Sequence, residues 1–258
     1  MGLSLCYELR FTGDVTAARR VLAELQQFAK SLDFSAVSDI VESGAPDRSE
    51  DDQDELSPEH ARVLTILGSQ YGQKTMRDGT EVWIDIPPKH VIAFGINPAE
   101  GSETAQFGLA THPAVVEHVH QDQTWIIETG LTGRFSWTQC CKTQYAGLQQ
   151  HGGASNFLFA HVGLVRCLDH LITLGVDVEV KDDSGYWEHR DEAKLRQSLT
   201  EWNHLIAAFA GQLKDQLAAH ADHGVKAPIL TAPDFEHLEA KGLRAWTSPD
   251  PSGASSED

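Results

Sequence analysis

Apolar residues in the first part of the chain follow two different periods. Residues 3–11 (LSLCYELRF) alternate between apolar and polar side chains, which is typical of a strand with one buried face. From Val15 to Leu32 the apolar residues recur every three or four positions, and Asp14 precedes them as a suitable N-cap, so a helix is expected there. Residues 34–41 again resemble a strand. The pattern therefore predicts a strand-helix-strand unit.

A run of shorter β-type segments occupies the middle of the chain. Pro58 suits the first turn of a short helix, which is expected over 61–70. Pro and Gly then separate segments that favour strands, which predicts a meander. These strands are expected at 81–86, 90–96, 104–110 and 134–142.

A second strand-helix-strand unit is predicted after the meander, with the strand 134–142 as its first element. Ser155 is expected to cap a buried helix over 156–174, and Gly175 is expected to end it. The valines that follow alternate as in a strand (Val176, Val178 and Val180).

The carboxyl-terminal part of the chain has a helical period. Asp191 is expected to cap a long helix that reaches about residue 219, with its large apolar residues on one face. A shorter helix is expected over 234–241.

Together these elements predict an α+β fold. We expect a mixed β-sheet built from the two strand-helix-strand units plus the β-meander, with helices mainly on one face and a long C-terminal helix. The order of the elements is that of a ferredoxin-like duplication, although the two units share no close sequence repeat. We assign residues 1–223 to a single α+β domain and residues 224–246 to a C-terminal appendage.

Two segments contain too few apolar residues to fold by burial. Residues 43–57 include the acidic run DRSEDDQDE, and residues 247–258 are rich in Pro, Ser, Gly and acids. Burial cannot offset the entropy lost on ordering such segments. We therefore expect a mobile insert, which can be shortened with little effect on thermal stability, and a disordered tail.

The charge of the chain restricts its partners. The 258 residues carry a formal net charge of −18, and no basic stripe is visible, so nucleic acid is not an expected partner. A basic protein or a cationic ligand would instead be attracted. The apolar runs are too short to span a bilayer, and no signal peptide is visible at the amino end. These features predict a soluble, cytoplasmic protein that does not bind membranes.

The four cysteines show no recognisable pairing pattern. They form no C-x-x-C pair, and the adjacent Cys140 and Cys141 are unsuited to bridging each other. We therefore expect Cys6, Cys140, Cys141 and Cys167 to be free thiols in a reducing compartment. A redox or nucleophilic role for Cys140 or Cys141 stays open.

His161 is the first candidate for a functional residue. At helical spacing it points away from the polar stripe of its helix and lies among Phe157, Val165 and Leu168. A histidine on an apolar face is more often a core residue with satisfied hydrogen bonds than a catalyst. If it were catalytic, it would act as a general base.

The strand 134–142 separates by alternation into an apolar and a polar face. Its polar face includes Thr138, Cys140 and Lys142, and Tyr145 follows shortly after the strand. This face is either a solvated side of the sheet or the floor of a ligand site. In the second case Lys142 and Tyr145 are ligand-binding candidates.

The segment 182–191 (DDSGYWEHRD) combines aromatic and charged residues. Turn formation accounts for residues 182–185, and helix capping accounts for Asp191. The residues left without such an explanation are candidates for ligand binding: Tyr186, Trp187, Glu188 and Arg190.

These candidates are expected to lie close together. If the strands 134–142 and 176–181 are parallel neighbours, their carboxyl ends meet at one edge of the sheet, with the connecting helix packed above. Lys142, His161 and the turn 186–190 would then surround one site.

Metal binding has little support. His118 and His120 are two residues apart and would share the face of a strand, and His112 is nearby, but nothing at standard spacing completes a zinc site. We predict no metal and no cofactor.

Three segments resemble a bacterial protein family with no assigned activity: KTQYA, the helix after HGG, and the D-x-x-G-Y-W-E-x-R-D turn. The resemblance covers most of the chain and implies no function. We predict a cytoplasmic binding protein for a small polar or cationic ligand or a basic protein partner. The alternative is a metal-independent hydrolase or transferase in which His161 is the general base. The residues that would position its substrate are Lys142, Tyr145, Glu188 and Arg190.

Overall fold

The computed structural model describes residues 2–45, 57–75, 79–120, 123–218 and 227–247. Most of the insert expected at 43–57 lies outside the described residues. The same is true of the tail expected at 247–258, apart from its first residue.

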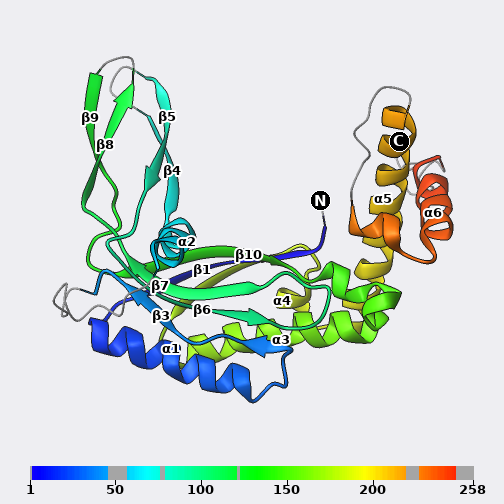
Figure 1. The fold of residues 1–258 in the computed structure, drawn as a ribbon, viewed down its shortest axis with the longest axis horizontal. Helices are drawn as coiled ribbons and strands as arrows, with labels where there is room; N and C mark the ends of the chain where they lie inside the picture. Colours follow the sequence, from blue (N-terminus) through cyan, green and yellow to red (C-terminus); the bar gives the residue numbers. More distant parts are fainter. Residues whose placement is uncertain (1, 46–56, 76–78, 121–122, 219–226, 248–258) are drawn as a thin grey trace, which may run out of the picture.

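A seven-stranded sheet forms the centre of the molecule (Figure 1). Its strands follow the order β11-β1-β10-β7-β6-β2, and β3 also pairs with β6. Every pairing is antiparallel. The bounds are β1 (Ser4–Phe11), β2 (Ala36–Val37), β3 (Val41–Ser43), β6 (His90–Asn97), β7 (Ala105–Thr111), β10 (Phe135–Lys142) and β11 (Asp177–Asp182).

The strand β1, which lies next to the edge strand β11, has the alternation that its sequence predicts. Leu5, Tyr7 and Leu9 are buried on the face that the helices cover, whereas Cys6 and Glu8 point to the opposite face. β1 lies between β10 and β11 and is antiparallel to both. Consequently β10 and β11 run in the same direction, but they are not the direct neighbours that we expected.

Helices α1 (Val15–Lys30) and α3 (Gly153–Thr173) lie side by side under one face of the sheet (Figure 1). As expected, Asp14 caps α1, because its side chain accepts a hydrogen bond of 2.7 Å from the Ala17 amide. The start of α3 was predicted incorrectly: Gly152 is left-handed, with φ of 100°, and the helix begins directly after it rather than after Ser155.

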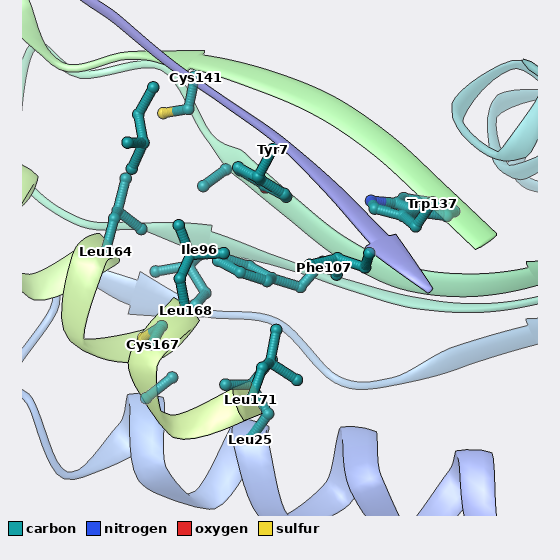
Figure 2. Close-up of a cluster of buried hydrophobic side chains, with 14 of the residues drawn as sticks. Tyr7, Leu25, Ile96, Phe107, Trp137, Cys141, Leu164, Cys167, Leu168 and Leu171 are labelled. Carbon is teal, nitrogen blue, oxygen red and sulfur yellow. The ribbon is translucent and has the colours of Figure 1, made fainter. Parts of the chain in front are cut away.

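The main core fills the space between the sheet and these two helices. Figure 2 shows Tyr7 and Phe107 above the α3 side chains of Leu168 and Leu171. The Tyr7 hydroxyl and the Trp137 indole N–H each donate a hydrogen bond of 2.8 Å to the Gln106 carbonyl oxygen. The polar atoms of these two large side chains are therefore satisfied inside the core.

The α+β class is confirmed. The strands β11-β1-β10-β7, with α1 and α3 on one face, have the order of a ferredoxin-like split β-α-β unit. The strands β2, β3 and β6 extend this unit at one edge.

A pair of β-hairpins projects from the side of the sheet opposite α1 and α3 (Figure 1). The first consists of β4 (Gln70–Thr75) and β5 (Glu81–Ile86), and the second of β8 (Val115–His120) and β9 (Gln123–Glu128). The buried residues between them are Val82, Ile84, Ile86 and Ile127. We call the two hairpins the hairpin arm. Helix α2 (Pro58–Gly68) lies at its base.

The other end of the sheet carries a helical arm (Figure 1). It comprises α5 (Glu192–Ala218), the short turn η4 (Pro228–Thr231) and α6 (Phe235–Thr247), which packs along α5. The long C-terminal helix is thus confirmed, and Asp191 caps it by accepting from the Ala193 and Lys194 amides. None of the described helices is long and apolar enough to cross a membrane.

Candidate functional site

Three segments that we expected to converge do meet at one end of the sheet. Ser4 at the start of β1 is paired with Lys142 at the end of β10, and Leu5 is paired with Asp182 at the end of β11. The short elements η2 (Gln144–Gly147), η3 (Gln149–His151) and α4 (Tyr186–His189) close this end. The juxtaposition arises through β1, which lies between the two strands.

His161 lies at this end but is sealed from solvent. Its side chain is 0% exposed, and both ring nitrogens have partners. Nδ1 lies 2.9 Å from the Thr143 hydroxyl, and Nε2 lies 3.1 Å from the Asp182 carboxylate. The Ser184 hydroxyl is a further 3.3 Å contact of Nε2. His161 therefore has the surroundings of a satisfied core histidine.

The carboxylate of Asp182 is the centre of this network. It accepts hydrogen bonds from the Ser184 amide, the Ser184 hydroxyl and the Trp187 amide, at 2.7–2.9 Å. Burial acts to raise the pKa of Asp182. The hydrogen bond and charge of His161, with the donors of Ser184, outweigh burial and lower the pKa to about 2. The network thus fastens α3 to the ends of β10 and β11.

The geometry differs from that of a Ser-His-Asp triad. In a triad, the nucleophile and the carboxylate bond opposite nitrogens of the imidazole. Here Ser184 and Asp182 both lie at Nε2, and the Ser184 hydroxyl donates to the carboxylate. Such an arrangement does not supply a base that activates Ser184.

The aromatic turn is also engaged in packing. Tyr186 is buried and presents its ring to His161, with 6.0 Å between centroids. Arg190 lies over the Trp187 ring at 4.5 Å and makes two hydrogen bonds of 2.8 Å to Asp169 on α3. The acid that pairs with Arg190 is thus Asp169, whereas Glu188 in the same turn is exposed. Arg190 therefore clamps α4 onto α3.

The remaining candidates have other surroundings than His161. Lys142 lies two residues after Cys140 and shares its face, and its ammonium is 3.7 Å from a carboxylate oxygen of Glu103. Tyr145 is half-buried in η2, where burial and then the charge of Glu103 raise its pKa. The predicted site residues thus share one end of the sheet without facing one cavity.

The open face of the sheet, opposite α1 and α3, contains a shallow groove of about 180 Å³. Glu8, Glu179 and Lys181 place charges along it, and Arg10 nearby forms ion pairs with both acids. The residues that line it come from β1, β10 and β11: Cys6, Tyr7, Glu8, Thr138, Glu179, Val180 and Lys181. A second groove, of about 190 Å³ and more apolar, lies between α2 and β6.

The expectation of four free thiols was wrong. Cys6 and Cys140 are directly paired across β1 and β10 and form a disulfide, with 3.9 Å between their Cα atoms. The sequence separation of 134 residues concealed this pair from local reasoning. Cys141 and Cys167 are free and buried, and burial raises the pKa of each thiol to about 12. Cysteine content therefore no longer supports a reducing compartment.

The histidines considered for metal binding have other surroundings. His112 is buried, with Nε2 2.9 Å from the Gly68 carbonyl oxygen and Nδ1 3.3 Å from the Ser136 hydroxyl. Burial lowers the pKa of His112 more than the Gly68 hydrogen bond raises it. In the described ranges no three His, Cys, Asp or Glu side chains gather as metal ligands would. Metal content stays a matter for elemental analysis.

Comparison of the chain with protein-family models, with curated proteins and with solved structures finds no match. The argument for a function therefore depends on the geometry alone.

Proposed function

We propose that the protein is a binding protein without catalysis of its own, and that its hairpin arm binds a basic protein partner. The observation that carries the proposal is the character of the arm's two outward faces. Alternation along the paired strands places these side chains outward: Tyr71, Gln73, Thr75, Glu81, Trp83 and Asp85 on one hairpin, and Val115, Glu117, Val119, Thr124, Ile126 and Glu128 on the other.

Large apolar side chains are unusually exposed on these outward faces. The exposed fractions reach 70% for Trp83, 68% for Tyr71, 69% for Val119 and 63% for Ile126. Aromatic residues of this kind are enriched at protein interfaces and supply much of the binding energy when a partner buries them. Several exposed apolar side chains on one projecting element favour a role in binding another protein.

The charge of the same faces favours a basic partner. Acids alternate with the apolar residues, namely Glu81, Asp85, Glu117 and Glu128, and no Lys or Arg occupies the described outward positions. The net charge of −18 adds a long-range field of the same sign. A partner surface that combines Lys or Arg with apolar residues would complement the arm.

The two grooves described above are smaller than most small-molecule sites. Those on the open face and beside α2 measure about 180 and 190 Å³. Small-molecule sites are usually concave spaces of roughly 300–1,000 Å³ that enclose most of their ligand. The sealed surroundings of His161 likewise favour binding over general-base catalysis.

A peptide display selection on the whole immobilised protein tests the proposal. We expect the enriched peptides to combine Lys or Arg with aliphatic or aromatic residues and to bind more weakly as salt is raised. A selected peptide should bind about tenfold more weakly to Trp83→Ser or to Ile126→Ser, depending on which outward face it contacts, because each change removes an exposed apolar contact. Ile172→Ser is the matched control, since Ile172 is 48% exposed on α3, away from the arm.

Two results would contradict the proposal. Enriched peptides without basic residues would contradict a basic partner, and peptides that bind both Trp83→Ser and Ile126→Ser as well as the unaltered protein would place the interaction outside the arm. Sedimentation that shows a dimer, lost in Trp83→Ser, would assign the arm to a second copy of this chain instead.

A further inference from the structure

We propose that the Cys6–Cys140 disulfide is a thiol-exchange site, opened under native conditions by a dithiol reductant that approaches over the open face of the sheet. The proposal does not depend on the hairpin arm, because the disulfide is in the sheet and its chemistry is measured without a binding partner.

The strand register places three side chains in one row on the open face. Cys6 in β1 is paired with Cys140 in β10 on one side and with Lys181 in β11 on the other. The row Lys181–Cys6–Cys140 therefore crosses three neighbouring strands, and the S–S bond lies along it. The apolar residues next to these positions, Leu5 and Cys141, are buried on the opposite face.

Access to the bond follows from this row. Exchange requires a thiolate to attack one sulfur in line with the S–S bond. The line of attack on Cys6 comes from the side of β11, where the groove is lined by Cys6, Lys181 and Glu179. Lys181 lines the same groove and supplies a positive charge that attracts an incoming thiolate. Cys140 is exposed, so its sulfur can leave into water.

The exchange is balanced as two substitutions at sulfur. The first thiolate of the dithiol bonds to the Cys6 sulfur, the Cys6–Cys140 bond breaks, and its electron pair leaves on the Cys140 sulfur. The second thiolate of the reductant then attacks the reductant's own sulfur in the mixed disulfide and releases Cys6 as a thiolate. The dithiol is oxidised to a disulfide, and Cys6 and Cys140 take up the two protons.

The two remaining cysteines do not compete for this chemistry. Cys141 is adjacent in sequence but points into the core, where its thiol donates to the Glu103 carbonyl oxygen. Cys167 is buried in α3. Both are held as neutral thiols by burial, so exchange remains confined to one bond.

The first experiment measures reduction of the folded protein with dithiothreitol, followed by differential alkylation and mass spectrometry. We expect Cys6 and Cys140 to become alkylated while circular dichroism stays native, and Cys141 and Cys167 to react only after denaturation. Reduction only at the rate of global unfolding would overturn the proposal. So would free Cys6 and Cys140 in protein prepared without reductant.

The second experiment tests the direction of attack with glutathione, a monothiol whose mixed disulfide is trapped by alkylating the cysteine thiolate that leaves. Peptide mapping should find the adduct on Cys6. Lys181→Gln should slow its formation about threefold, whereas Lys181→Arg should retain the rate. Lys194→Gln is the control, because Lys194 is exposed on α5, outside the groove. An adduct on Cys140, or equal rates for Lys181→Gln and Lys194→Gln, would overturn the approach over Lys181.

Discussion

The carboxylate of Asp182 joins three elements through one buried charge. It is bonded to His161 on α3 and to the backbone of Trp187 in α4, and it belongs itself to the end of β11. Removing one member of such a buried network costs more than its hydrogen bonds suggest, because the partners are left unsatisfied.

The lowered pKa of Asp182 predicts how its contribution to stability depends on pH. The folded pKa of about 2 lies below the unfolded value of 3.8, so the contribution is present above about pH 4 and is lost as the pH falls towards 2. Its size is about 2 kcal/mol. Asp182→Asn should therefore lower the free energy of unfolding by about that amount at pH 5 and by about half of it at pH 3.

Urea unfolding at the two pH values checks this prediction. Glu188→Gln is the matched control, because Glu188 is an exposed carboxylate in the adjoining α4. It should leave stability unchanged at both values. If Asp182→Asn lowers the free energy of unfolding by the same amount at pH 5 and pH 3, the fold does not hold the carboxylate ionised.

For single residues, the sequence predicts those roles that depend on partners only a few positions away in the chain. The capping by Asp14 and Asp191 could be predicted because each bonds amides within three residues. Gly175, with φ of 83°, follows the end of α3 as expected. The role of Asp182 was assigned to turn formation alone, since its partner His161 is 21 residues away.

The contact between α5 and α6 depends on small residues. A Cβ added at Gly242 would collide with the backbone carbonyl oxygen of His204 on α5. A Cβ added at Gly211 would instead meet the carboxylate end of Glu239, a flexible side chain that can move away. Both glycines therefore lie in the contact between α5 and α6, but Gly211 should tolerate an added side chain better than Gly242.

We predict that Gly242→Ala destabilises the packing of α6 by about 1–3 kcal/mol, because backbone cannot move aside as a side chain can. Gly211→Ala should be near neutral, since Ala is a better helix former than Gly and only Glu239 must rotate. Hydrogen exchange over 235–247 is the measurement. Equal protection of 235–247 from exchange in both variants would show that the packing of α6 does not depend on the close approach of Gly242 to α5.

Helices and strands could be predicted where apolar residues recur with a clear period. The strand β5 was placed at its observed bounds, and β6, β7 and β10 within one residue. The strand expected over 34–41 is instead two short pieces, β2 and β3. The hairpins of the arm were largely missed, because β4 (QYGQKT) has almost no apolar residue and its pairing with β5 is what makes it a strand.

The Cys6–Cys140 disulfide crosslinks two strands that are far apart in the sequence. Cys6 and Cys140 are 134 residues apart, and a crosslink across such a loop contributes about 5 kcal/mol in the chain-entropy model. The double variant Cys6→Ser with Cys140→Ser should therefore unfold at clearly lower urea concentration. The reduced natural protein should unfold at the same urea concentration as the double variant. Reductant should not change the urea concentration at which the double variant unfolds. A double variant as stable as the oxidised protein would contradict the prediction.

At the scale of the whole molecule, the class of fold could be predicted but the arrangement of its parts could not. Alternating and helical periods are local and identify an α+β protein. The sheet order depends on pairings between segments that are far apart, such as Leu5 with Asp182. No single sequence shows these pairings, so neither the open face nor the two arms beside it could be foreseen.

The position of β1 between two strands that come much later in the chain has a consequence for synthesis. It leaves the ribosome well before its partners β10 and β11, which end at Lys142 and Asp182. At roughly 5–20 residues per second, its apolar face waits on the order of ten seconds or more before either partner can pair with it. We therefore expect the nascent chain to expose an aggregation-prone strand during synthesis, and slower translation before β10 to lengthen that exposure.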